Sequence, residues 1–226
     1  TSILGSATAE AAAKIITAAR PYAAAYLEAA DEAVPFSDGL FVAPHTNRTI
    51  DLDSLVEQLA VPGQPHVLNM AHSYETAGAT YPYGCHIAEV EIDPASCDIT
   101  IVKFTVVDDF GLVINPMMLA GQIHGGIAQG VGQALYEHVV YDVSGQILSG
   151  SFMDYTMPRA DHFPQLDIHM HNTPCQNNIL GIKGSGEAGA IGAPQAVVSA
   201  VCDGLGIQHI DMPITPLKIF NILHQN

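Results

Sequence analysis

The sequence predicts an α+β fold in which an antiparallel or mixed sheet carries helices packed on one side. Residues 84–107 show the alternating pattern of a β-hairpin. Residues 119–138 show the apolar pattern of a helix that is unusually rich in glycine. The elements do not follow the regular strand–helix–strand order of a doubly wound parallel sheet. We therefore expect mainly antiparallel strand pairing.

Two domains are predicted on either side of a short linker. The sequence Pro-Gly-Gln-Pro at 62–65 is typical of a linker. It separates an N-terminal helical arm with one short strand, residues 1–61, from an α+β segment, residues 66–226. The short strand is expected over residues 40–43.

The N-terminal domain is predicted to contain two helices. Residues 6–30 are rich in alanine and place apolar side chains at helical spacing, and Pro21 should kink or divide this helix. A second helix is expected over residues 51–59, with Thr49 or Asp51 as its N-cap. The alanine-rich helix needs a surface to pack on, either in the body of the protein or on a partner chain.

The second domain opens with the hairpin. From Gly84 to Asp93 apolar residues alternate with glutamates, and a tight turn leads into a strand over residues 99–107. After a loop comes the predicted helix over 119–138. Each glycine inside a helix costs about 0.5–1 kcal/mol relative to alanine, so close packing against a ligand or another backbone is expected there. The glycines concerned are Gly125, Gly126, Gly130 and Gly132.

The rest of the chain predicts further strands and helices. A strand pair is expected over 139–141 and 147–149, followed by a polar loop over 154–163 and a strand over 166–171. Two helices end the chain, and a glycine-rich loop precedes them.

Composition excludes several classes of function. The chain carries 7 Lys and Arg against 23 Asp and Glu, a formal net charge of −16, which opposes binding to nucleic acid or to an anionic membrane surface. The four cysteines form no CxxC pair, so they predict neither a zinc site nor an iron–sulfur cluster on this chain. No apolar run has the length of a membrane span and the N-terminus has no signal-peptide pattern, so we expect a cytoplasmic protein with reduced thiols.

The most informative motif is the segment Gly181–Gly189, with the sequence GIKGSGEAG. It places one carboxylate, Glu187, in a run of glycines just before a helical pattern. Glycines let the backbone approach a bulky ligand closely, and a helix that starts near Glu187 directs its free N–H groups to the same place. From this segment alone two interpretations stay open: a ligand site, or an acidic residue that only favours the start of a helix.

Other common site types do not fit this motif. Its glycines match the spacing of a dinucleotide fingerprint, but only 13 residues separate Gly189 from Asp203, too few for the helix, turn and strand of that unit. A serine-hydrolase elbow would need glycine at the position of Lys183. The eleven histidines form no HExxH motif.

Four motifs in order resemble the C-terminal part of the molybdenum-binding large subunit of the xanthine oxidase, aldehyde oxidoreductase and aerobic carbon monoxide dehydrogenase family. They are VDDFGLVINP (107–116), GQIHGGIAQG (121–130), MDYTMP (153–158) and the segment 181–189. The resemblance covers residues 1 to about 223 and implies that the α+β segment is part of a molybdenum-cofactor-binding domain. The opening Thr1-Ser2 resembles the end of the family's GSR cofactor loop, which implies that Ser2 binds the cofactor.

The resemblance implies roles for the matched residues. Glu187 matches the family's general base beside the molybdenum, and Gln122 matches the glutamine that hydrogen-bonds the pterin. Asn115 lies in the loop before the glycine-rich helix, near the cofactor. The chain need supply no metal ligand, because the cofactor brings its own sulfur ligands. The other matched positions approach the cofactor or leave it room: Gly125, Gly126, Lys183, Gly184, Ser185 and Gly186. One departure is Ile179, where the family commonly has proline.

The resemblance also implies cofactors and partners. They are a molybdenum–molybdopterin cofactor in its cytosine dinucleotide form, iron–sulfur and FAD groups on partner chains, the remainder of the large subunit, a [2Fe-2S] subunit and an FAD subunit. The implied reaction is the water-derived hydroxylation of an aldehyde, an N-heterocycle or a similar small substrate. The alternative is a non-catalytic fragment or assembly module of the same fold that binds no cofactor by itself.

Overall fold

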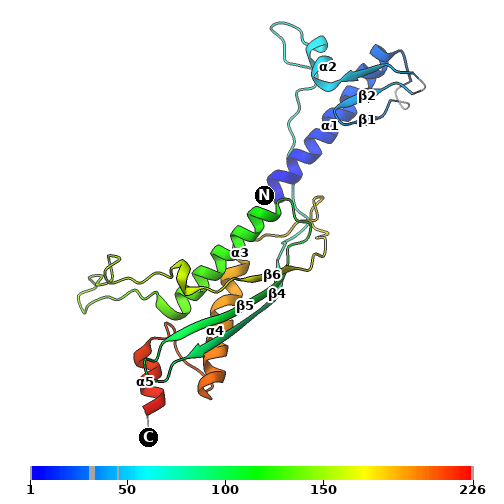
Figure 1. The fold of residues 1–226 in the computed structure, drawn as a ribbon. Helices are drawn as coiled ribbons and strands as arrows, with labels where there is room; N and C mark the ends of the chain where they lie inside the picture. The colour runs from blue at the N-terminus through cyan, green and yellow to red at the C-terminus, as the bar shows by residue number, and fades with distance from the viewer. Residues whose placement is uncertain (1, 31–33, 45, 225–226) are drawn as a thin grey trace. The chain divides into compact units, whose positions relative to one another are not determined.

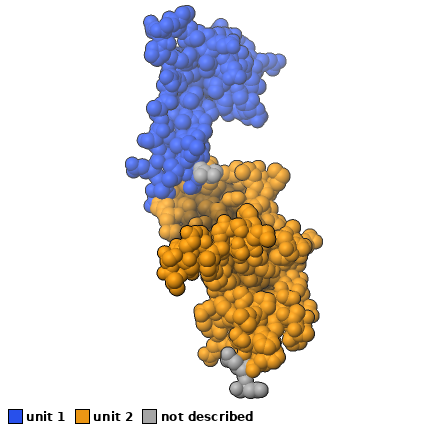
Figure 2. Space-filling model, turned by 90° about the vertical axis from the view of Figure 1, so that its left-hand side faces the viewer, with its two compact units in different colours: residues 1–77 blue, residues 78–226 orange. Residues whose placement is uncertain are grey.

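The computed structural model describes residues 2–30, 34–44 and 46–224. It divides the chain into two compact units, Thr1–Ala77 and Gly78–Asn226 (Figures 1 and 2). The predicted linker at 62–65 lies within the first unit. Leu68 is buried in the core of that unit, so the division falls after Ala77 instead.

The first unit contains two helices and a small antiparallel sheet. The predicted strand and both predicted helices are present, and the Asp51 side chain caps α2 by accepting a hydrogen bond from the Ser54 N–H at 2.7 Å. Two further strands were missed, because strands of two or three residues carry no periodic pattern. The elements are α1 (Ser2–Leu27), β1 (Phe36–Ser37), β2 (Leu40–Val42), β3 (Thr49–Asp51) and α2 (Leu52–Leu59).

Of the two predicted effects of Pro21, a kink or a division, the division is wrong, because α1 runs through Pro21 to Leu27. A proline in a helix removes one N–H donor and leaves the carbonyl four residues earlier, here that of Thr17, without its usual partner. Both residues are exposed, so water can bond this carbonyl and the helix continues to Leu27. The last turns of α1 pack on the small sheet of their own unit, where Ala23 and Phe41 are fully buried.

The second unit contains a three-stranded mixed sheet. Its strands are β4 (Tyr83–Ile92), β5 (Ile99–Asp109) and β6 (Asp167–Met170), and β5 pairs antiparallel with β4 and parallel with β6. The predicted hairpin and the predicted third strand are therefore confirmed.

Three helices complete this unit: α3 (Pro116–Val131), α4 (Ala188–Leu205) and α5 (Pro216–His224). α3 continues into one π-helical turn over Gly132–Tyr136, so the α-helix ends earlier than predicted. The apolar side chains of β5, α3 and α4 form one core, and α4 packs on both α3 and β4 (Figure 1). The fully buried members include Val106, Ile123, Ile127, Val131, Ala193, Val197, Val201 and Ile219.

The crossing of α3 and α4 explains two of the helical glycines. A Cβ on Gly126 would lie 2.8 Å from the Cα of Gly189, and a Cβ on Gly130 would lie 2.8 Å from the Cβ of Ala193. Side chains at these positions would push the two helices apart. The predicted close approach to another backbone is thus found at Gly126, whereas a Cβ on Gly125 would meet nothing within 4 Å.

The predicted strand pair over 139–141 and 147–149 is present only in part: the segments lie antiparallel, and the Leu148 N–H donates to the Val140 carbonyl at 2.8 Å, but neither forms a regular strand. A single bridge joins Tyr141 and Ile147, and the Asp142 carboxylate closes the turn between them by accepting the N–H of Ser144 and of Gln146. A two-stranded ribbon with no third strand is only marginally stable, so regular pairing does not extend further.

α4 is long and apolar enough to cross a membrane, the one such helix found among the described residues. The expectation that no segment has this length was therefore wrong. Val197 and Val201 of α4 are fully buried in the core of the second unit. Packing on α3 and β4 accounts for the apolar side chains on the buried face of the helix.

Candidate active site

The glycine loop, residues 181–187, is joined by its first half to the segment that follows β5. The Lys183 N–H donates to the Phe110 carbonyl at 2.9 Å, and the Leu112 N–H donates to the Gly181 carbonyl at 2.8 Å. These two bonds hold the start of the loop antiparallel to residues 110–112.

Two residues shape this junction. Gly111 has a φ of +68°, and a Cβ there would collide with the Gly181 carbonyl, so the close approach requires glycine. The buried side chain of Asn178 donates to the Ile182 carbonyl at 2.8 Å and accepts the N–H of the same residue at 3.1 Å. These two hydrogen bonds fix the start of the loop, although Ile179 stands where the family commonly has proline after this asparagine.

A buried ion pair lies directly behind the loop. Lys183 Nζ is 2.9 Å from Asp109 Oδ2, and the two side chains are 7% and 5% exposed. Asp109 Oδ1 also accepts the N–H of Gly111 at 2.8 Å and of Thr173 at 3.0 Å. The Lys183 ammonium lies 4.1 Å from the ring centroid of Tyr83, a cation–π contact.

The pKa values of both partners favour the charged pair. Burial raises the pKa of Asp109, but the Lys183 ammonium and the two N–H donors outweigh it and hold the pKa well below the ordinary 3.8. Burial lowers the pKa of Lys183, and the hydrogen bond to Asp109 outweighs it, so the pKa is raised above 10.5.

The tip of the loop is free. Residues 184–186 make no hydrogen bond to another described segment. Glu187 is exposed and precedes the first residue of α4, where its carbonyl accepts the N–H groups of Ala190 and Ile191, each at 3.0 Å. Its carboxylate makes no capping bond. This carboxylate is therefore available to a ligand.

Gln122 of α3 lies beside this tip. It is exposed, and its Nε2 is 3.8 Å from the position that a Cβ on Gly186 would take. The start of α4 touches the same turn of α3, because a Cβ on Gly189 would lie 2.6 Å from the Ile123 carbonyl oxygen. The fold thus brings Gln122 and the Glu187 segment, 65 residues apart in sequence, to one end of the α3–α4 pair.

The other predicted residues have different surroundings. Asn115 is the N-cap of α3, and its Oδ1 accepts the Met118 N–H at 3.0 Å, so this side chain stabilises the helix. The space next to Gly126 is taken by the backbone of Gly189, whereas the space next to Gly125 is open.

The role of Ser2 stays a prediction. It is the first residue of α1 in the other unit, and Thr1 lies outside the described residues. Sequence reasoning missed Asp109 and Asn178, which hold the loop from behind. The pair of acids at the end of a strand, just before Gly111, was the available signal for Asp109.

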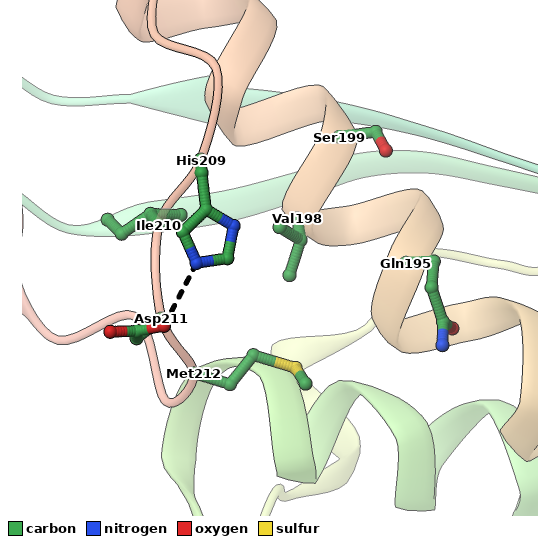
Figure 3. Close-up of a pocket in the computed structure, with 7 residues that line it drawn as sticks. All are labelled: Gln195, Val198, Ser199, His209, Ile210, Asp211 and Met212. Atoms are coloured by element: carbon green, nitrogen blue, oxygen red, sulfur yellow. Dashed lines mark hydrogen bonds and ion pairs between the residues drawn. The ribbon is translucent and has the colours of Figure 1, made fainter.

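A separate cavity of about 250 Å³ lies between α4 and the segment before α5 (Figure 3). His209 Nε2 and Asp211 Oδ1 pair at 2.9 Å at its edge. It contains none of the predicted site residues, so the glycine loop remains the candidate active site. The cavity is lined by Gln195, Val198, Ser199, His209, Ile210, Asp211 and Met212.

Comparison with known proteins identifies the family. Residues 1–164 match the model of the molybdopterin cofactor-binding domain, and the chain belongs to this family. The chain is 32% identical over 98% of its length to the 6-hydroxypseudooxynicotine dehydrogenase complex subunit gamma of Paenarthrobacter nicotinovorans. It is 33% identical over 70% of its length to the carbon monoxide dehydrogenase large chain of Hydrogenophaga pseudoflava. It spans 29% and 20% of these two relatives.

Solved structures agree with this assignment. A Cu,Mo-CO dehydrogenase matches 98% of the chain with a TM-score of 0.86 and 28% identity. Quinoline 2-oxidoreductase from Pseudomonas putida 86 matches 95% with a TM-score of 0.81 and 33% identity. The chain covers 29% and 28% of these structures. The resemblance and the α+β fold predicted from sequence are confirmed.

Proposed function

We propose that this chain forms the C-terminal, cofactor-facing part of a molybdenum hydroxylase large subunit, in which Glu187 is the general base. One observation carries the proposal. A free carboxylate stands at the start of α4, beside the Gln122 amide and an untethered glycine tip, in a chain of the molybdopterin cofactor-binding family.

The residues around the tip fit a bulky, hydrogen-bonding cofactor. A Cβ on Gly125 would meet nothing within 4 Å, and the nearest atom to one on Gly184 is the Thr80 carbonyl oxygen at 3.9 Å. The backbone of residues 184–186 is therefore open to close approach, with N–H groups that make no bond to other described segments. This donor set is suited to the oxygen and nitrogen acceptors of a pterin and its phosphate.

Each residue of the candidate site has a specific role in this proposal. When bound, the molybdenum cofactor supplies the two-electron oxidation of the substrate. The Gln122 amide holds the pterin by hydrogen bonds, and the N–H groups of 184–186 orient it. Glu187 accepts the proton from the water-derived oxygen as that oxygen adds to the electron-poor carbon of the substrate. Lys183 supports the loop from its buried side, through its ion pair with Asp109.

The proposal extends to the remaining parts of the enzyme. We infer the cytosine dinucleotide form of the cofactor, a [2Fe-2S] subunit and an FAD subunit that carry the electrons away, the rest of the large subunit, and a cytoplasmic location. Two relatives are named for N-heterocycles, a nicotine 6-hydroxylase and a quinoline 2-oxidoreductase. N-heterocycles are therefore the first substrate class to assay, followed by aldehydes.

The test is Glu187→Gln in the complete enzyme. Glutamine keeps the size of the side chain but cannot accept the proton, so turnover should fall by about 10²–10⁴-fold while molybdenum content stays at the wild-type level. Glu89→Gln, an exposed glutamate of β4, is the matched control and should turn over like wild type. Wild-type turnover by Glu187→Gln would leave Glu187 as a helix-start residue only. A complex without molybdenum would instead favour the non-catalytic module.

A further inference from the structure

Asp109 connects three segments of the second unit. It is the last residue of β5, its carboxylate accepts the N–H of Thr173 in the segment after β6, and it pairs with Lys183 of the glycine loop. The side chain is 5% exposed and lies behind the loop, so it does not itself face the open tip. Its contacts are those of an anchor.

Asp109 holds the loop at Lys183, directly before the free tip that leads to Glu187. Lys183 is the last loop residue with both a backbone bond and a side-chain bond to another segment. Three residues without such bonds follow, and then comes Glu187. A loop that is released at Lys183 can move its tip, and a displacement of about 1 Å at a reacting group can lower a rate by about 10²-fold.

The neighbouring carboxylate provides a contrast. Asp108 is 3% exposed, about as buried as Asp109, and its Oδ1 is 3.4 Å from Nε2 of His86 on β4. Successive strand residues point to opposite faces, so Asp108 does not bond the glycine loop. A variant at Asp108 therefore removes an equally buried carboxylate from the same strand end without touching the anchor.

We infer that Asp109 is a positioning residue, which holds Glu187 in its working place by way of Lys183. This inference rests on the proposed function of Glu187. Asp109 itself touches neither substrate nor cofactor. Its effect is expected in kcat and not in KM, because substrate binding does not depend on the proton acceptor.

The experiment compares Asp109→Asn, Asp108→Asn, Lys183→Met and the double variant Asp109→Asn/Lys183→Met in the complete enzyme. Rates are expressed per bound molybdenum, and amide hydrogen exchange is followed in peptides that cover residues 181–191. For Asp109→Asn we expect kcat to fall by about 10–100-fold, KM to stay within about threefold, and exchange in these peptides to rise by about tenfold or more. For Asp108→Asn we expect kcat within about threefold of wild type and unchanged exchange in these peptides.

The double variant tests the route through Lys183. If Asp109 acts through Lys183, the losses of the two single variants will not add, and the double variant will be no slower than the slower single variant. Additive losses, or an Asp109→Asn enzyme no slower than Asp108→Asn, would overturn the inference. If Asp109→Asn does not fold, Lys183→Met breaks the same link and must show the same rise in exchange. Exchange also separates this inference from the proposed function, because it reports a released loop even if Glu187→Gln turns over normally.

Discussion

Replacing Gly126 by alanine should destabilise the protein, although alanine is the better helix former. A methyl group at this position would lie 2.8 Å from the Cα of Gly189 and 2.9 Å from the backbone nitrogen of Ala190. Ordinary contact begins near 3.4 Å, so α4 would have to move away by about 0.6 Å. The obstructing atoms belong to the backbone and cannot rotate away.

The magnitude follows from two opposing contributions. Overpacking of a close contact costs about 1–3 kcal/mol, and the gain from replacing a helical glycine with alanine is about 0.5–1 kcal/mol. The net loss for Gly126→Ala is therefore about 0–2.5 kcal/mol of the free energy of unfolding, centred near 1 kcal/mol. Gly121→Ala is the matched control in the same helix, because a Cβ there meets nothing within 4 Å, and it should stabilise the protein by about 0.5–1 kcal/mol.

Urea unfolding of the two variants and the wild type measures this difference. We expect the midpoint for Gly126→Ala below that of wild type and the midpoint for Gly121→Ala above it, with the same slope for all three. A Gly126→Ala protein as stable as Gly121→Ala would show that the helices do not cross at this glycine, and the argument for close packing would fail.

Two further predictions concern the site. Gln122→Ala should lower molybdenum content, while molecules that keep the cofactor retain most of their rate in single-turnover reduction; full molybdenum loading would contradict a role in holding the pterin. Because the folded-state pKa of Asp109 lies below 3.8, its ionised form contributes its full stability above that pH and loses it as the pH falls further. The urea midpoints of wild type and Asp109→Asn should thus differ by a constant amount from about pH 5 to about pH 8 and approach each other below pH 3.8.

Local patterns predicted the local elements of the fold. The hairpin and β6 were found because alternation of apolar and polar residues is visible within a few positions. The Asp51 cap was among the two candidates because its side chain acts on an N–H three residues away. The sequence left open whether Pro21 kinks or divides α1, since the tolerance of a proline in a helix depends on exposure, which local sequence does not reveal.

The candidate site required contacts between distant segments. Family motifs selected Gln122 and Glu187, and the structure places the segments that carry them at one end of the helix pair. The Asp109–Lys183 pair joins positions 74 residues apart, and no periodic pattern links such residues. A buried charged pair depends on the burial of both partners, and burial is a property of the folded chain.

The glycines of α3 lie on two different faces of the helix. Gly126 and Gly130, four residues apart, face α4 and let its backbone approach, whereas Gly121 and Gly125, also four apart, face open space. The first pair sets the place where α4 begins, because Gly189 rests against the Ile123 carbonyl and Gly126. Glu187 lies two residues before Gly189, so its position depends on this crossing as well as on the anchor at Lys183. A shift of α4 in Gly126→Ala should therefore displace the acid even in molecules that remain folded.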